Sequence, residues 1–307
     1  MTKVFIDGSA GTTGLRIHER LESRSDLELI ILPDEVRKDV SARRDALNSA
    51  DVAFLCLPDD AARESVSLCD SPDTVIIDTS TAHRTADGWT YGFPELFGKR
   101  EEIAVSKRIA NPGCHASGFI ALVEPLVRAG LISPSAELSC FSITGYSGGG
   151  KKMIADYEAE EVDSLLLAPR QYALGQAHKH LPEMSKIAGL TAAPIFSPIV
   201  APFYSGMEVT VPLFKSQVAG GLSDIAAVYR ECYKSGLVHF VDDASEGGFL
   251  SAAAMSGRDD MQVTVCGNDE RILLVSRFDN LGKGASGAAI QNMNIVLGID
   301  ESTGLEV

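Results

Sequence analysis

The stretch Ile109-Ala110-Asn111-Pro112-Gly113-Cys114-His115-Ala116-Ser117-Gly118 marks the point at which the pattern of the sequence changes. An apolar strand end is followed by a tight Asn-Pro-Gly turn and then by a cysteine, which we expect in the first turn of a helix running to about Arg128. The N–H groups and partial positive charge of a helix N-terminus stabilise an anion, so a thiol there favours the thiolate, the form that attacks carbon. Cys114 is therefore a candidate nucleophile, and a buried core cysteine is the competing interpretation.

The composition is that of a globular protein with about two domains. The chain has 307 residues, of which 45% are hydrophobic and 22% are charged, an ordinary balance for a soluble protein. Its net charge of -15 argues against nucleic acid and against an anionic membrane surface as partners. An anionic substrate must therefore be held by a local cluster of basic residues.

The cysteine spacing and the uncharged segments argue against a secreted or membrane protein. Six cysteines are scattered without CxxC or CxxH spacing, which is neither a disulfide framework nor a zinc pattern and suits a reducing compartment. The N-terminal residues run straight into a strand, so we expect no signal peptide and a cytoplasmic location. The uncharged run 187–207 contains Pro194, Pro198 and Pro202, which would break a membrane-spanning helix.

A dinucleotide-binding unit is predicted at the start of the chain. Residues 3–6 form a short apolar run, and a glycine-rich turn connects them to a helical stretch at 15–21. Glycines let the backbone approach a pyrophosphate, which then lies on the helix N-terminus. The spacing G-x-x-G-x-x-G differs from the commoner G-x-G-x-x-G, and a merely flexible turn is the alternative. The residues expected to bind the cofactor here are Gly8, Ser9, Ala10, Gly11, Thr12, Thr13 and Gly14.

Further apolar strands predict a parallel sheet covered by helices on both faces. These strands span residues 27–32, 52–57 and 74–78. After the first of them, Asp34 and Glu35 offer the acid that binds the 2′-hydroxyl of NAD. Arg37 and Lys38 offer the cation that accommodates the 2′-phosphate of NADP. Because both kinds of side chain are present, the residues alone leave the choice of cofactor open.

Beyond Arg128, alternating strands indicate an α+β domain built on a mostly antiparallel sheet. We expect its strands at 137–144, 195–200, 207–213, 261–266 and 271–278, and a helix at 222–232. A terminal helix with a small-residue face is expected to return to the first domain. The predicted fold is therefore α/β, with a Rossmann-type NAD(P)-binding domain at 1–112 plus about 284–307 and a catalytic and dimerisation domain at 113–283.

Two histidines in the second domain are candidates for acid–base chemistry. His178 and His180 are two residues apart, so in an extended segment both point to the same side, and Glu183 follows closely. Histidine is the usual general acid or base near neutral pH. No third ligand with suitable spacing supports a metal site at this pair. An ordinary surface loop is the plainer alternative.

Six motifs occur in the order found in one enzyme family. They are Gly-Ser-Ala-Gly-Thr-Thr-Gly at 8–14, Asp-Thr-Ser-Thr-Ala-His-Arg at 78–84, Tyr-Gly-Phe-Pro-Glu at 91–95, Asn-Pro-Gly-Cys at 111–114, His-Lys-His-Leu-Pro-Glu at 178–183 and the small-residue segment at 283–294. Together they resemble the short form of the N-acetyl-gamma-glutamyl-phosphate reductase family, in the semialdehyde dehydrogenase superfamily, over residues 3 to about 298.

The resemblance implies an NADPH-dependent oxidoreductase of arginine biosynthesis. Such an enzyme reduces a small acyl phosphate, N-acetyl-gamma-glutamyl phosphate, to N-acetyl-glutamate 5-semialdehyde and releases phosphate. Cys114 would form the thioester intermediate. One histidine would act as general acid or base, with His180 favoured over His178 and Glu183 orienting it. We also expect a homo-oligomer, either a dimer or a tetramer, for which the antiparallel sheet of the second domain could supply the interface, and we expect no metal.

Binding roles implied by the resemblance fall on residues of both predicted domains. Arg84 follows a strand at the sheet edge where such folds bind ligands, and its planar fork suits a phosphate; a solvated arginine is the alternative. NADP is the expected cofactor, with Arg37 or Lys38 at its 2′-phosphate. The other expected substrate contacts are Asn111, Ser147 and Lys151, and the other expected cofactor contacts are Pro58, Ser80 and Asn292.

Alternative functions remain open at the level of the sequence. Longer family members carry an Arg-Gly pair where this chain reads Tyr-Ser-Gly-Met at 204–207, so the contact made there is in question. Aspartate-semialdehyde dehydrogenase is the second candidate enzyme, with a substrate one methylene shorter. A hydrophobic pocket distinguishes one methylene by only about 1–3 kcal/mol. A cofactor-binding sensor without turnover is the candidate from a different class.

Overall fold

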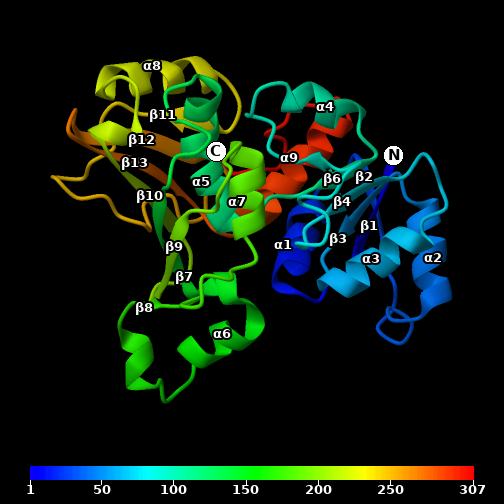
Figure 1. Ribbon diagram of the computed structural model, residues 1–307. Helices are drawn as coiled ribbons and strands as arrows, with labels where there is room; N and C mark the ends of the chain where they lie inside the picture. The colour runs from blue at the N-terminus through cyan, green and yellow to red at the C-terminus, as the bar shows by residue number, and fades with distance from the viewer. The chain divides into compact units, whose positions relative to one another are not determined.

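The computed structural model describes all 307 residues and divides the chain into two compact units (Figure 1). Unit 1 comprises Met1–Pro94, Gly98–Pro112 and Ala285–Leu305. Unit 2 comprises Glu95–Phe97, Gly113–Gly284 and Glu306–Val307. None of the helices combines the length and the apolar character needed to cross a lipid bilayer.

Unit 1 is built on a six-stranded sheet in which all neighbouring strands are parallel, in the order β2-β1-β3-β4-β6-β5. The strands are β1 (Thr2–Asp7), β2 (Leu27–Ile30), β3 (Val52–Leu55), β4 (Val75–Asp78), β5 (Thr90–Tyr91) and β6 (Arg108–Ala110). The helices are α1 (Thr12–Leu21), α2 (Val40–Ser49), α3 (Asp59–Leu68), α4 (Lys99–Val105) and α9 (Gly287–Val296). Strands β3 and β4 are buried along their whole length, as expected for parallel strands covered on both faces.

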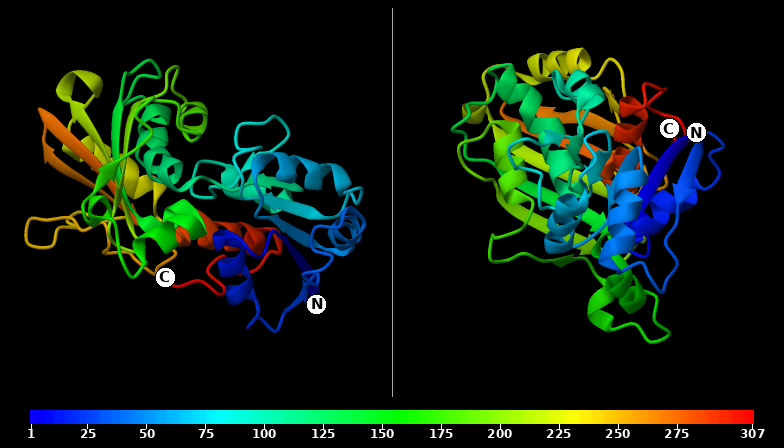
Figure 2. Two further views of the ribbon diagram at one scale, coloured as in Figure 1. Left: turned by 90° about the horizontal axis from the view of Figure 1, so that it is seen from below. Right: turned by 90° about the vertical axis from the view of Figure 1, so that its right-hand side faces the viewer.

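Two hydrophobic clusters lie on opposite faces of this parallel sheet. One joins Ile17 of α1 and Met293 of α9 to the side of β1 that carries Val4. The other joins Leu47 of α2 to the opposite side of β1, which carries Phe5. Figure 2 shows the same arrangement, with the blue and red helices on one side of the sheet and the paler blue helices on the other. A helix from the end of the chain therefore completes a core that the first residues begin.

Unit 2 contains a seven-stranded mixed sheet in the order β11-β12-β13-β10-β7-β9-β8. Its strands are β7 (Ser139–Gly145), β8 (Arg170–Gln171), β9 (Ile195–Ala201), β10 (Met207–Phe214), β11 (Val238–Phe240), β12 (Met261–Asn268) and β13 (Arg271–Phe278). The pairs β7–β9 and β11–β12 are parallel, and the other four neighbouring pairs are antiparallel. The helices are α5 (Cys114–Arg128), α6 (Gly150–Tyr157), α7 (Leu181–Ala188) and α8 (Leu222–Cys232). Short helical turns occur at Tyr146–Gly149, Ser164–Leu167, Lys215–Gln217 and Gly282–Ser286.

Helices α5 and α8 pack on the same face of the mixed sheet. Gly118 of α5 permits the close approach, because a Cβ atom there would lie 2.5 Å from Val209 Cγ2 of β10. The side chains of β10 alternate between that buried face and the opposite one, and Phe214 on the opposite face is exposed. One face of the sheet thus lacks a helical cover within the chain.

The predicted fold class is confirmed, and the differences concern where elements begin and end. Helix α1 begins at Thr12 rather than at Leu15, because Gly11 already serves as its N-cap. Strand β2 ends at Ile30 rather than at Leu32, shortly before Pro33, which has no N–H to donate to a sheet. Residues 95–97 belong to unit 2 although their sequence neighbours belong to unit 1, an exchange that no local pattern indicates.

Candidate active site and cofactor pocket

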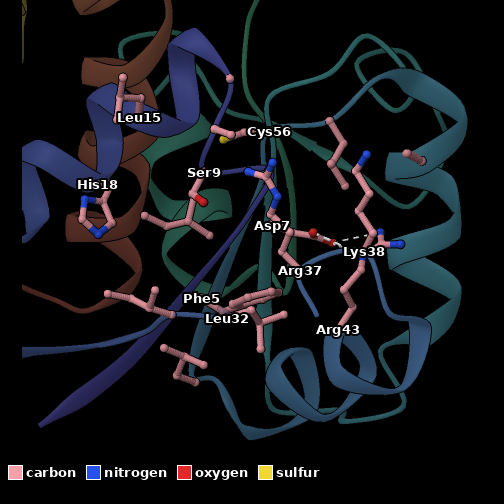
Figure 3. Close-up of a pocket in the computed structure, with 18 of the residues that line it drawn as sticks. Phe5, Asp7, Ser9, Leu15, His18, Leu32, Arg37, Lys38, Arg43 and Cys56 are labelled. Carbon is pink, nitrogen blue, oxygen red and sulfur yellow. Dashed lines mark hydrogen bonds and ion pairs between the residues drawn. The ribbon is translucent and has the colours of Figure 1, made fainter. Parts of the chain in front are cut away.

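A pocket of about 630 Å³ in unit 1 lies at the glycine-rich turn between β1 and α1 (Figure 3). Gly8 has a φ of +90°, and a Cβ atom there would lie 2.4 Å from the carbonyl oxygen of Cys56. A Cβ atom on Gly14 would lie 2.5 Å from the carbonyl oxygen of Gly8. These two glycines let the turn fold tightly against β3, whereas Gly11 lines the pocket as the N-cap of α1. The helix therefore presents its first N–H groups to the pocket, as a pyrophosphate requires.

Cations line the same pocket. Arg37 and Lys38 both line it, whereas Asp34 and Glu35 do not. Arg43 also lines it, and its guanidinium pairs with Asp7, with 3.1 Å between Nη2 and Oδ2 (Figure 3). Arg43 is therefore fixed by a buried partner, while the other two cations lie at the surface of the pocket.

The remaining residues expected at the cofactor divide into two groups. Ser9, Ala10 and Pro58 line the pocket together with Gly8 and Gly11. Thr12, Thr13 and Gly14 form the first turn of α1 and do not line it. Ser80 and Asn292 also lie outside the pocket.

The side chain of Ser80 is hydrogen-bonded within the protein, whereas that of Asn292 has an oxygen without a partner. The hydroxyl of Ser80 donates to Asp78 Oδ2 at 2.8 Å, and its backbone N–H donates to the other oxygen of the same carboxylate. Asn292 is fully buried, and its Nδ2 donates to the carbonyl of Gly92 at 2.9 Å. Its Oδ1 has no hydrogen-bond partner in the protein. A buried acceptor without a donor favours contact with a bound group.

In unit 2, Cys114 is the first residue of α5, as the sequence predicts. The N-cap is Gly113, whose missing side chain leaves the N-terminus of the helix without a side-chain cap. A Cβ atom on Gly284 would lie 2.9 Å from Cys114 Cβ, so the small residue at 284 leaves room for the thiol. Cys114 is partly exposed, whereas Cys140 is buried, and burial raises the pKa of the Cys140 thiol. Burial likewise raises the pKa of Cys56 to about 12. Its position at the N-terminus of α5 distinguishes Cys114 from these two thiols, whose pKa is raised.

Glu183 braces the turn that precedes Cys114. It lies in α7 and is almost fully buried, and its Oε1 accepts a hydrogen bond from the backbone N–H of Gly113 at 2.7 Å. A carboxylate bound to a backbone N–H makes a charge-assisted hydrogen bond. The acid that the sequence placed beside the histidines thus also contacts the nucleophile turn.

The two histidines of the His-Lys-His segment lie together in unit 2. The ring centroids of His178 and His180 are 4.7 Å apart, and His178 Nδ1 accepts a hydrogen bond from the backbone N–H of His180. Burial, and next the nearby charge of Lys179, lowers the pKa of His178 to about 4. His178 is therefore uncharged at neutral pH. No group of three or more His, Cys, Asp or Glu side chains is arranged to hold a metal ion.

Two further residues join this cluster that the sequence did not single out as site residues, His115 and Tyr172. The His115 ring lies 5.6 Å from that of His180 and 5.7 Å from that of His178, and its Nε2 is 2.7 Å from the Tyr172 hydroxyl. A polar imidazole within an otherwise apolar helix was the only local signal for His115. Tyr172 gave no signal, because its partner is 57 positions away in the sequence.

The expected substrate ligands of unit 1 are already engaged within that unit. Arg84 is nine-tenths buried, and it donates from Nε to the carbonyl of Asn111 at 2.9 Å and from Nη2 to that of Thr79 at 3.0 Å. The Nδ2 of Asn111 donates to the carbonyl of Ala285 at 3.0 Å, and its Oδ1 accepts from Asn292 at 3.3 Å. Arg84 therefore holds the Asn-Pro-Gly turn in place.

The other two expected substrate ligands lie in unit 2. Ser147 is buried, and its hydroxyl accepts a hydrogen bond from Asn280 Nδ2 at 3.0 Å. Lys151 is exposed on α6, a helix with no buried residue. Residues 204–207 are the place where longer family members carry an Arg-Gly pair. There the Ser205 hydroxyl donates to Asp279 Oδ2 at 2.9 Å. Ser205 thus helps to hold the loop that follows β13.

Two family models together cover nearly the whole chain. Residues 3–106 match the semialdehyde dehydrogenase NAD-binding domain, and residues 114–280 match the semialdehyde dehydrogenase dimerisation domain. The fold and the site therefore define a nicotinamide-dependent oxidoreductase of the semialdehyde dehydrogenase class.

Curated relatives narrow the class to one family. The chain is 46% identical to "N-acetyl-gamma-glutamyl-phosphate reductase 2" from a Nostoc species, over 99% of both chains. It is 44% identical to the protein of the same name from Pseudomonas putida, over 98% of both chains. It is 46% identical to N-acetyl-gamma-glutamyl-phosphate reductase from Brucella ovis, over 96% of this chain and 99% of that one. The chain belongs to the N-acetyl-gamma-glutamyl-phosphate reductase family.

Solved structures share the fold at much lower sequence identity. Aspartate semialdehyde dehydrogenase II from Vibrio cholerae has a TM-score of 0.73 and 16% identity, over 97% of this chain and 98% of that one. Aspartate semialdehyde dehydrogenase from Candida albicans, solved with NADP, has a TM-score of 0.66 and 13% identity, over 97% of this chain and 99% of that one. Both support the two-unit architecture.

Proposed function

We propose that this protein reduces N-acetyl-gamma-glutamyl phosphate with NADPH, giving N-acetyl-glutamate 5-semialdehyde and phosphate. The identity of 44–46% to reductases of that name, over nearly the full length of both chains, carries the proposal. The position of Cys114 at the start of α5 supplies the chemistry that the reaction needs. Aspartate-semialdehyde dehydrogenases are similar in fold at 13–17% identity and carry no argument about the substrate.

Cys114 acts as the nucleophile in the proposed reaction. Its sulfur attacks the carbonyl carbon of the acyl phosphate, the bond from that carbon to the phosphate oxygen breaks, and phosphate leaves a thioester on the enzyme. The positive end of α5 stabilises the attacking thiolate and the oxyanion that develops. Glu183 keeps this N-terminus in place through Gly113. When bound, the nicotinamide supplies a hydride to the thioester carbon, after which the carbon–sulfur bond breaks and the aldehyde is released.

His180 is the proposed general acid and base, with His178 in a supporting role. A histidine with a pKa of about 4 is a poor proton donor near neutral pH, and burial gives His178 that value. Because His178 Nδ1 accepts from the backbone N–H of His180, His178 helps to fix the segment that carries the other ring. His180 would take the thiol proton during acylation and return it to the sulfur of Cys114 when the carbon–sulfur bond breaks and the aldehyde forms.

NADP is the proposed form of the cofactor. Arg37 and Lys38 line the pocket, whereas the acids that would bind the free 2′-hydroxyl of NAD do not. The N-terminus of α1 suits the pyrophosphate, and the unsatisfied Oδ1 of Asn292 suits a polar group of the cofactor. Arg84 is proposed as a positioning residue rather than a direct phosphate ligand, since two of its donors already bind backbone carbonyls.

A homodimer through the open face of the mixed sheet is the proposed assembly. The strand registers place four exposed apolar side chains on that face: Phe141, Ile195, Phe214 and Leu273. Exposed apolar patches of this kind mark protein interaction sites. The region lies within the match to a dimerisation domain, which argues for a second copy as the partner.

The reverse reaction with phosphate and NADP tests the activity. We expect N-acetylglutamate semialdehyde to be oxidised with a kcat/KM at least about tenfold above that of aspartate semialdehyde, since one methylene alone is worth about 10–200-fold. Replacing the nucleophile in Cys114→Ser should lower kcat by on the order of 10³-fold or more. Cys69→Ser, which changes a partly buried thiol on unit 1, is the matched control. Faster turnover of aspartate semialdehyde would move the assignment to that enzyme, and an active Cys114→Ser variant would overturn the thioester mechanism.

A further inference from the structure

His115 lies at the centre of a buried hydrogen-bonded chain in unit 2. It is the second residue of α5 and is 3% exposed. Its Nδ1 lies 2.6 Å from the hydroxyl oxygen of Ser142 on β7, and its Nε2 lies 2.7 Å from the hydroxyl oxygen of Tyr172. Both ring nitrogens therefore have a partner.

The same ring packs against the histidine pair of the proposed active site. Its centroid is 5.6 Å from that of His180 and 5.7 Å from that of His178, and Phe196 closes the cluster at 5.3 Å. One imidazole thus contacts both candidate acid–base groups, and its neighbour in sequence is the nucleophile. A change in its position would be transmitted to all of them.

His115 is uncharged at neutral pH. Burial, and then the nearby charges of His178 and Lys179, lowers its pKa to about 3. A neutral imidazole carries one proton, so one ring nitrogen donates and the other accepts. Two arrangements are possible. In one the Tyr172 hydroxyl donates its proton to Nε2 of His115, and in the other its oxygen accepts a proton from Nε2.

Ser142 decides between the two arrangements. Its hydroxyl is fully buried, and the contact with His115 is the one side-chain hydrogen bond it makes. If Nδ1 carried the proton, the serine would accept it and its own proton would be buried without an acceptor, which is costly. Ser142 therefore donates to Nδ1, and the imidazole proton lies on Nε2.

With the proton on Nε2, His115 donates to the oxygen of Tyr172. The tyrosine then keeps its own proton for another acceptor, and it makes no other hydrogen bond through that hydroxyl. Burial, and next the charge of Cys114, raises the pKa of Tyr172, so the hydroxyl stays protonated and lies within electrostatic reach of the nucleophile. The hydrogen-bonded chain thus runs from Ser142 through His115 to Tyr172, and its middle member directly follows Cys114 in the sequence.

We propose that His115 is a positioning residue for the chemistry at Cys114: with its proton on Nε2 it fixes the Tyr172 hydroxyl as a hydrogen-bond donor to the group bound at that cysteine. This rests on the proposed function, in which the bound group is an acyl oxygen that gains negative charge. Tyr172 supplies the hydrogen bond to that oxygen, and His115 holds Tyr172 and packs beside His180 without touching the substrate.

Five variants measured in the reverse reaction test the positioning role. His115→Leu removes both hydrogen bonds and should lower kcat about 10–100-fold with KM changed less than threefold. His115→Gln restores a donor near the Nε2 position and should keep kcat within about fivefold of the parent. Tyr172→Phe should match His115→Leu, and the double variant should lose no more than either single change. Tyr229→Phe removes the hydroxyl of a buried tyrosine outside the histidine cluster, one that donates to the carbonyl of Leu122, and should leave kcat within about threefold.

Kinetic outcomes can contradict the proposal in two ways. Tyr172→Phe at parental kcat would show that the hydroxyl does not act. A multiplicative loss in the double variant would show that His115 and Tyr172 act independently. If His115→Leu fails to fold, the comparison of Tyr172→Phe with Ser142→Ala retains the test, because Ser142→Ala should give a smaller loss of the same kind.

A measurement without substrate separates this proposal from the proposed function. In ¹⁵N-histidine-labelled protein, His115 should show a protonated Nε2 and an unprotonated Nδ1, unchanged between pH 5 and pH 8. A proton on Nδ1, or a titration in that range, would overturn the inference even if the enzyme is active. If the parent protein has the proton on Nε2 but does not oxidise N-acetylglutamate semialdehyde, only the proposed function is contradicted.

Discussion

Among single residues, Arg37 and Lys38 are the ones on which the proposed preference for NADP depends. Both line the pocket, and Arg37 is additionally paired with Asp34 at 3.4 Å on the surface. A phosphate bound by such a side chain gains a charge-assisted hydrogen bond worth about 1.5–3 kcal/mol. Their removal should therefore affect the phosphorylated cofactor selectively.

The double variant Arg37→Ala, Lys38→Ala should raise KM for NADPH about 10–100-fold and change KM for NADH less than about threefold. Steady-state kinetics with both cofactors measures the two constants. Arg44→Ala removes an exposed cation of α2 that pairs with Asp70 and does not line the pocket, so it serves as the control. Equal losses with NADPH and NADH would rule out a 2′-phosphate contact.

His115 also makes the stability of unit 2 dependent on pH. Its pKa is about 3 in the folded protein because of burial, against 6.5 in the unfolded chain. The unfolded chain thus binds a proton below pH 6.5 that the folded protein does not, and the free energy of unfolding falls as pH decreases. The slope from this group approaches about 1.4 kcal/mol per pH unit between roughly pH 6 and pH 4.

Urea unfolding at pH 7.5, 6, 5 and 4.5 should show this acid-side loss. In His115→Gln, which has no titratable group at the position, the decline should be shallower by up to about 1.4 kcal/mol per pH unit. Other groups titrate equally in both proteins and cancel in the difference. Parallel curves for the two proteins would show that His115 is not buried as a neutral ring.

The site residues that could be predicted from the sequence are those whose roles depend on their neighbours in the sequence. Gly8, Gly11 and Cys114 owe their roles to a turn and the helix that follows it, and a stretch of ten residues contains that information. The Glu183 contact with Gly113 and the Ser142–His115–Tyr172 chain join residues 27 to 70 positions apart. Only the tertiary fold brings those partners together.

Among the elements, α5 is the one whose packing constrains the site most. It begins at Cys114 and ends at Arg128, the span that the apolar spacing predicts, and it packs closely on β10 and β13. The sequence reveals its length and apolar face but not why Gly118 lies in its interior. The reason is a neighbour in the sheet, and sheet pairing across β10 and β13 has no local signature.

Gly118→Ala should destabilise the protein. In an exposed helix the change would gain about 1 kcal/mol, but here the new Cβ would lie 2.5 Å from Val209 Cγ2 and 2.8 Å from Ser276 Oγ. Overpacking of this kind costs about 1–3 kcal/mol. Urea denaturation measures the change, and Gly175→Ala, where no atom lies within 4 Å, should show no loss. A Gly118→Ala protein as stable as its parent would mean that α5 moves away from the sheet freely.

For the whole molecule, the uncovered face of the mixed sheet predicts how the protein assembles. Phe141 is 48% exposed and lies opposite Thr210 of β10, on the same face as Leu273. A carboxylate on this face would be buried without a partner in a dimer. Phe141→Asp should therefore convert the dimer into a folded monomer.

Size-exclusion chromatography with light scattering gives the mass of each form, and circular dichroism checks the fold. Val105→Asp is the matched control, because Val105 is 82% exposed at the end of α4 in unit 1 and is not part of the mixed sheet. A Phe141→Asp protein with unchanged mass would place the interface elsewhere on the chain.

The return of α9 to the parallel sheet has a consequence during synthesis. All six strands of that sheet lie within the first 110 residues, but Ala289, Ile290 and Met293 of α9 belong to its core. A ribosome must make residues 113–284 before that helix emerges, which takes roughly 10–30 s. For that interval one apolar face of the nascent sheet is covered only by α1 and α4 and lacks the side chains of α9, and the apolar surface left exposed is a natural client for a chaperone.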